Sequence, residues 1–128
     1  MAEQSWLAKR IASVRTSRQR TGDAAEEQAL LYLQQAGLKL VHRSFLCKGG
    51  EIDLIMQDQT TLVFVEVRKR TSSQFGGAIA SVTPAKQRRM VHAAQVYLQT
   101  QHTEPACRFD LLAIDDQEIN WLKNVIIG

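Results

Sequence analysis

The segment from Gly49 to Arg70, GGEIDLIMQDQTTLVFVEVRKR, constrains the fold of this 128-residue chain more than any other. It contains two runs, residues 50–57 and 62–70, in which apolar residues occupy both alternating sets of positions. Side chains of a strand alternate between the two faces of a sheet, so strands of this kind are buried on both faces. We therefore predict a sheet that is covered on both sides.

The rest of the chain supplies helices and further strands. Apolar residues recur at helical intervals over residues 23–36, and Gly37 is placed to end that helix. Thr83 and Pro84 are typical of the N-cap and first position of a second helix, which we expect to run to about residue 101. The other expected strands cover residues 38–45, 107–114 and 118–122. The order α-β-β-β-α-β-β predicts an α/β fold.

Basic residues are concentrated at the N-terminal end. Residues 1–20 carry five basic side chains against one acid, whereas the whole chain has a net charge of +3. We predict a basic, flexible arm over residues 1–20 and a single domain over residues 21–128. The arm suits contact with phosphate backbones, and a solvated tail is an equal alternative. Residues 71–81 are small and polar and are expected to form a mobile loop, in which Phe75 either packs on the core or stacks on bases.

Composition excludes several classes of protein. No apolar run approaches the roughly 20 residues that cross a membrane. Cys47, Cys107 and the three histidines show no zinc-binding spacing. We therefore expect a reduced, cytoplasmic protein without a membrane span.

Acidic side chains interrupt the two central strands. If the strands form a hairpin with a four-residue loop, Asp53 lies directly opposite Glu66, and Glu51 lies opposite Arg68. Like charges placed so closely repel each other, whereas a divalent cation that prefers oxygen ligands turns the repulsion into attraction. Glu26 shares a helical stripe with the apolar residues that would pack on the sheet, so a third acid is expected nearby.

Simpler interpretations of the same acids stay open. Glu51 and Arg68 suit an ordinary cross-strand ion pair. Glu26 suits a first-turn acid that the helix dipole stabilises. Asp53 and Glu66 would need no ligand if they reached solvent at a sheet edge.

The motifs GGEIDLI, FVEVRKR and RFDLLAI, behind a first helix of pattern TG…E…A…L, resemble the YraN-type family of small bacterial proteins over roughly residues 20–122. That family is similar to the restriction-endonuclease-like superfamily, and above all to the archaeal Holliday-junction resolvases. Their signature is an Asp, a spacer and Glu-x-Lys, with a Glu on the first helix. The resemblance implies a restriction-endonuclease-like αβββαβ core with a mixed central sheet flanked by helices, and it allows a homodimer.

Matched to that signature, Asp53 and Glu66 become the strand acids and Glu26 the helix acid. The resemblance implies that Asp53, Glu66 and the carbonyl of Val67 bind Mg²⁺ or Mn²⁺. The cation would polarise the scissile phosphate and lower the pKa of an attacking water. Arg68 stands where the signature has lysine.

Because of this arginine, two different functions can be expected. Arginine stays charged and cannot act as a base, although it can hold a phosphate and stabilise transition-state charge. The first hypothesis is therefore a Mg²⁺-dependent endonuclease-like protein that hydrolyses phosphodiester bonds of DNA, including branched DNA, with Arg68 as the electrophile. The alternative is a catalytically degenerate DNA-binding module of the same fold. A structural protein whose acids pair with Arg68 and Arg108 is the third interpretation, so enzyme activity stays open.

Other cations suit contact with DNA. Lys86, Arg88 and Arg89 open the second helix, where they run against the helix dipole and suggest phosphate binding, with a solvated basic face as an equal alternative. Lys48 is placed to approach the acids from a loop, whereas Lys69 faces away from them.

Overall fold

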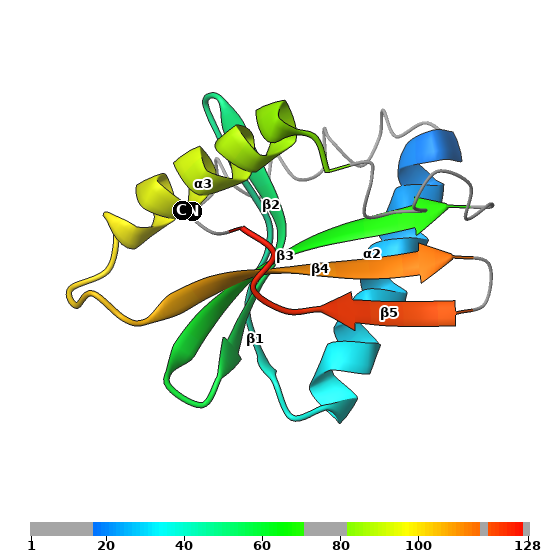
Figure 1. Ribbon diagram of the computed structural model, residues 1–128, viewed down its shortest axis with the longest axis horizontal. Helices are drawn as coiled ribbons and strands as arrows, with labels where there is room; N and C mark the ends of the chain where they lie inside the picture. Colours follow the sequence, from blue (N-terminus) through cyan, green and yellow to red (C-terminus); the bar gives the residue numbers. More distant parts are fainter. Residues whose placement is uncertain (1–16, 71–81, 116–117, 127–128) are drawn as a thin grey trace, which may run out of the picture.

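The computed structural model describes residues 17–70, 82–115 and 118–126 (Figure 1). The loop expected at residues 71–81, with Phe75, lies outside the described residues, as does most of the expected basic arm. No helix in the described part of the chain is long and apolar enough to cross a membrane. Both cysteines are free.

Two helices and five strands follow one another in the predicted order. The helices are α2 (Ser17–Gln35) and α3 (Pro84–Leu98). The strands are β1 (Lys39–Cys47), β2 (Gly50–Asp58), β3 (Thr61–Arg70), β4 (Cys107–Asp115) and β5 (Glu118–Leu122).

The five strands form one mixed sheet in the order β1-β2-β3-β4-β5. Neighbouring strands are antiparallel except β3 and β4, which are parallel because the chain returns through α3 between them. In Figure 1, α2 lies behind the sheet and α3 lies above it. The predicted mixed α/β architecture is confirmed.

Each face of the sheet carries its own apolar cluster. On one face Leu33 of α2 packs with Leu54 and Val65, and on the other Ala93 of α3 packs with Phe64. All of these side chains have less than 1% of their surface exposed. The prediction of a sheet buried on both faces is therefore confirmed.

Both helices end or begin as their sequences predict, with one correction. The amide of Leu38 donates to the Leu33 carbonyl and that of Gly37, at φ 101°, to Gln34, which is the hydrogen-bond pattern of a Schellman C-cap. The Thr83 hydroxyl accepts the amide of Lys86 at 3.3 Å. However, α2 begins at Ser17 rather than near residue 23, since the glycine at position 22 costs only about 1 kcal/mol inside a helix.

The β2–β3 hairpin has the predicted register but a shorter turn. Ile55 pairs with Phe64, as expected, and the ladder continues to a pair between Asp58 and Thr61. The loop is therefore two residues long rather than four, and it turns at Gln59, where φ is 57°.

A close approach joins the β1–β2 turn to α3. A Cβ on Gly50 would lie 2.5 Å from the carbonyl oxygen of Arg89 and 3.0 Å from Cβ of Ala93, so only glycine allows this contact. Two residues earlier in the turn, the carbonyl of Lys48 lies 3.0 Å from Nε2 of His92. The β1–β2 hairpin, which carries Asp53, is thereby packed against the middle of α3.

Candidate functional site

The site begins where β2 and β3 separate. Their ladder ends at the pair between Leu54 and Val65, so the expected direct pair of Asp53 with Glu66 is not formed. Instead, Oδ2 of Asp53 accepts the backbone N–H of Val67 at 2.8 Å. The carboxylate takes the place of a backbone carbonyl and fills the gap between the strands.

The irregularity continues into β1. Ser44 lies in β1 beside Asp53 of β2, and its φ of 52° interrupts the extended backbone. Strict alternation would place Ile52 on the same face as Leu54, yet Ile52 packs in the α3-side cluster and Leu54 in the α2-side cluster. Strand β2 therefore changes orientation at Asp53.

Glu26 of α2 hydrogen-bonds with Asp53. The stripe that carries Glu26 also carries Leu30 and Leu33, both buried on the sheet, so the prediction that Glu26 points toward the sheet is confirmed. A hydrogen bond between two carboxyl groups requires a proton on one of them. Burial raises the pKa of Asp53, and the charge of Glu51 adds to this, whereas the Val67 N–H, Glu26 and Arg68 oppose it.

Glu66 of β3 is the other strand acid of the site, and it is buried, with 8% of its surface exposed. Burial and then the charge of Asp53 raise its pKa from 4.5 to about 7, against the opposing charges of Arg68 and Lys86. Nη2 of Arg68 lies 2.8 Å from Oε1 of Glu66. The expected cross-strand ion pair of Arg68 with Glu51 is wrong, because the ladder ends before those positions and Arg68 turns to its neighbour on the same strand face.

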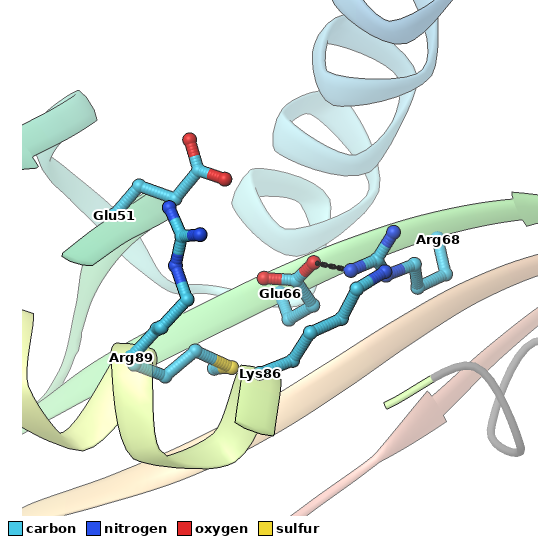
Figure 2. A pocket seen from close by; sticks show the side chains of 6 residues that line it. Glu51, Glu66, Arg68, Lys86 and Arg89 are labelled. Carbon is cyan, nitrogen blue, oxygen red and sulfur yellow. Dashed lines mark ion pairs between the residues drawn. The ribbon is translucent and has the colours of Figure 1, made fainter. Parts of the chain in front are cut away.

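Glu66 and Arg68 open into a small pocket between β3 and α3 (Figure 2). Figure 2 shows Lys86 extending from α3 toward Arg68 of β3, and Arg89 extending from the same helix toward Glu51 of β2. The residues that line the pocket are Glu51, Glu66, Arg68, Lys86, Arg89 and Met90. Asp53 and Glu26 are not among the lining residues, so the hydrogen-bonded pair of acids is separate from the mixed-charge pocket.

The structure separates the cations that the sequence grouped together. Lys86 and Arg89 line the pocket, whereas Arg88 lines a different depression on α3. Lys69 is exposed, and Lys48 does not line the pocket. A three-residue spacing places Lys86 and Arg89 on one helical face, and this signal was present in the sequence.

The donor set suits a hard divalent cation, although the present arrangement does not form a ready site. Carboxylate oxygens are ligands of the kind that Mg²⁺ prefers. Within the residues that the structure describes, no three acidic, histidine or cysteine side chains are grouped closely enough to hold a metal ion. Asp53 is turned to the Val67 N–H and Glu66 to Arg68. In a regular strand the C=O of a residue points to the same neighbour as its N–H, which places the Val67 carbonyl on the Asp53 side.

A second buried acid, which the sequence did not single out, lies in β4. Asp110 is fully buried and accepts N–H groups from Arg108 Nε at 3.1 and 3.2 Å, from Trp121 Nε1 at 2.9 Å and from the amide of Asn124 at 2.9 Å. Arg108 also pairs with Asp58 at 3.2 Å. The interpretation in which Arg108 pairs with the acids of the candidate site is therefore wrong, because its partners are Asp58 and Asp110 and the network ties β4 to β5 and the segment that follows it.

Comparison with known proteins adds the family. The model of "Uncharacterised protein family UPF0102" matches residues 25–114. A UPF0102 protein of Janthinobacterium sp. (strain Marseille) is 60% identical over 112 residues, which cover 88% of this chain and 91% of the relative. One of Herminiimonas arsenicoxydans is 61% identical over 88% of this chain and 90% of its own length. The expected YraN-type membership is thus confirmed, and the protein belongs to the UPF0102 family.

Proposed function

We propose that this protein binds DNA, including branched DNA, and hydrolyses its phosphodiester bonds with Mg²⁺ or Mn²⁺ in a restriction-endonuclease-like core. One observation supports this above all. Three acids, Glu26, Asp53 and Glu66, come from α2, β2 and β3 to the point where the two strands separate. Gathering partly desolvated like charges costs folding free energy, which is typical of functional sites.

Each residue of the site has a role in this proposal. Asp53 and Glu66 hold the cation, together with the carbonyl of Val67, and Glu26 orients Asp53 from behind. The cation, when bound, polarises the phosphate and lowers the pKa of a water. Arg68 binds a phosphate oxygen through its guanidinium and stabilises the negative charge that develops during the reaction.

When no cation is bound, protons and the charge of Arg68 compensate the negative charge of the acids. The hydrogen bond between Asp53 and Glu26 contains one such proton, and the raised pKa of Glu66 favours another near neutral pH. A cation has to displace these protons in order to bind the carboxylates. Its affinity is therefore expected to rise as the pH increases through about 7, with release of protons.

The alternative, a DNA-binding module without hydrolysis, has its own supporting observation. Arg68 already lies 2.8 Å from Glu66 and compensates the charge of that carboxylate with no need for a metal. Arginine also cannot accept a proton from water. In this alternative the acids keep Arg68 in place, and the basic surface alone binds DNA.

Cleavage of linear, flapped and four-way-junction DNA in Mg²⁺ or Mn²⁺ separates the two functions. The proteins to compare are the wild type, Asp53→Asn, Glu66→Gln and Arg68→Lys, with Glu104→Gln as a control at an exposed acid. We expect the wild type and the Glu104 variant to cut, and the Asp53 and Glu66 variants to lose about 100-fold or more, since a bound cation contributes several kcal/mol.

The remaining outcomes are equally decisive. Cleavage by Arg68→Lys alone would identify a degenerate centre and support the DNA-binding module. Absence of cleavage in every protein, with no heat of Mn²⁺ binding in calorimetry, would contradict the proposed hydrolysis.

A further inference from the structure

We propose that the DNA phosphate at this site is held from α3, by Arg89 together with Lys86, and that Arg88 beside them takes no part. The inference rests on the proposed function for its ligand, a phosphodiester, and deepens it by assigning the residues that bind that group. It also gives a reason for the two cations, Lys86 and Arg89, that α3 places in the same pocket as Glu66.

Two neighbouring arginines of α3 face different surroundings. Arg89 and Lys86 line the pocket with Met90, which is 2% exposed and anchors that side of the helix to the core. Arg88 lines a depression with Val91, His92 and other residues of the next helical ridge. The two arginines carry the same charge on the same helix, so only their direction distinguishes them.

The pocket contains N–H donors without acceptors. Within the described residues, the side chain of Arg89 forms neither an ion pair nor a hydrogen bond, although Glu51 lines the same pocket. Arg68 pairs through one nitrogen with Glu66, and its buried Nε–H has no acceptor in the part of the chain that the structure describes. A guanidinium offers five donors in a planar fork that matches the oxygens of a phosphate.

The charges of the pocket favour an anion. Three cations and two acids line it, and one of the acids, Glu66, already pairs with Arg68. Lys86 and Arg89 lie in the first two turns of α3, where the partial positive charge of the helix end opposes cations. A bound phosphate reduces both costs at once.

The packing of the hairpin on α3 sets the position of Arg89 relative to the acids. The backbone carbonyl of Arg89 touches Gly50 at a distance that would not admit a Cβ. Gly50 begins the strand that carries Asp53 three residues later. A phosphate held by Arg89 therefore lies next to the acids rather than elsewhere along the basic surface.

DNA binding in EDTA tests this without any contribution from cation binding or cleavage. Fluorescence anisotropy with a labelled four-way junction would compare the wild type with Arg89→Gln, Lys86→Gln and the matched control Arg88→Gln, over a range of salt concentrations. We expect the Arg89 and Lys86 variants each to bind about 5- to 20-fold more weakly and to lower the salt slope by about 1, with less than about twofold change for the Arg88 variant. Arg89→Lys should keep more affinity than Arg89→Gln, and thermal unfolding would confirm that the variants fold.

Several results would overturn the proposal. Equal losses for Arg88→Gln and Arg89→Gln would indicate a diffuse basic face, and unchanged binding by both pocket variants would exclude this role of α3. A wild type that does not bind the junction would also overturn it. The test stands apart from hydrolysis, because a selective loss with Arg89→Gln supports the α3 contact even if no variant cleaves DNA.

Discussion

Two regions of this molecule bury carboxylates, and their surroundings are opposite. Asp110 is completely buried, and N–H groups of Arg108, Trp121 and Asn124 all donate to it. Its charge is met from several directions by donors that the fold holds in place. Such a carboxylate is an ordinary structural element, and its network connects the last two strands to the segment that follows.

The acids at the break between β2 and β3 lack such compensation. Asp53 receives one backbone N–H, from Val67, and shares a hydrogen bond with another carboxyl group, Glu26. Glu66 has Arg68 as its ion-pair partner, while Asp53 repels its charge. Burial alone therefore does not mark a functional acid. The supply of donors is what separates the acids of the proposed site from Asp110, since a poorly compensated carboxylate is retained at a cost in stability.

The largest effect is expected for Asp110→Asn. The amide keeps the shape of the carboxylate but loses its charge, and one of its two acceptor oxygens becomes an NH2 donor. Either Trp121 Nε1 or the amide of Asn124 then faces a donor instead of an acceptor, and Arg108 loses its charged partner at this position. We expect the free energy of unfolding to fall by about 3–5 kcal/mol, as when a buried ion pair loses one partner. Urea unfolding measures this, and a loss below about 1 kcal/mol would contradict the contrast between the two regions.

Glu66→Gln should change the free energy of unfolding in the opposite direction from Asp110→Asn at high pH. The folded protein keeps a proton on Glu66 up to a pKa of about 7, whereas the unfolded chain loses it near 4.5. The folded state binds more protons in this window, so wild-type stability falls as the pH rises from about 4.5 to 7 and is constant above it. The neutral glutamine has no titrating proton, so it does not contribute this pH dependence of stability.

Across that window, the stability of the Glu66 variant relative to the wild type should therefore improve by on the order of 3 kcal/mol. Chemical unfolding at pH 5 and pH 8 measures the change. Parallel pH profiles for the two proteins would show that Glu66 is as well compensated as Asp110.

Gly50→Ala tests the packing that holds the acid site together. The new methyl group would meet the Arg89 carbonyl at 2.5 Å, and this backbone atom cannot move without shifting α3. We expect a loss of about 1–3 kcal/mol, as in other overpacked positions, together with weaker DNA binding. Gly37→Ala is the matched control, because it strains the backbone at φ 101° without any contact, so it should lower stability and leave DNA binding unchanged. Equal effects of both variants on DNA binding would argue against a packing role for Gly50.

The smallest effect is expected for Asp58→Asn. Asp58 pairs with the same Arg108 as Asp110, but a third of its side chain is exposed. Ion pairs that water and salt screen contribute little, so we expect a loss of less than about 1 kcal/mol, reduced further in high salt. A loss as large as that of Asp110→Asn, measured in the same urea titration, would mean that the arginine rather than burial dominates the network.

Local patterns in the sequence predicted much of the fold. All five strands and both helices occur in the predicted order, and the predicted C-cap at Gly37 and N-cap at Thr83 are present. The register of the β2–β3 hairpin followed from the position of the turn. The early start of α2 was missed, because helix start signals near residue 21 did not exclude an additional turn before them.

For the candidate site, the sequence indicated which acids would interact but not the partners of each one. Asp53 hydrogen-bonds with Glu26 and its charge acts on Glu66, but the direct strand pair of Asp53 with Glu66 is not formed. The partners were not predictable, because the break in the ladder turns Asp53 to the Val67 N–H and leaves Arg68 for Glu66. These choices depend on where two strands part, which no short-range pattern records.

The sequence by itself determined the elements, the burial of both sheet faces and the gathering of acids near the hairpin, since these follow from periods of 2 and 3.6 residues. Only the tertiary structure decided which acids are compensated. EID, VEV and RFD are alike as sequence, each an acid within an apolar strand. Two donors to Asp110, Trp121 and Asn124, lie 11 and 14 residues away in the sequence. Packing brings them to Asp110, and it brings no such set of remote donors to Glu66 within the described residues. The distance between segments remote in the chain is set by packing.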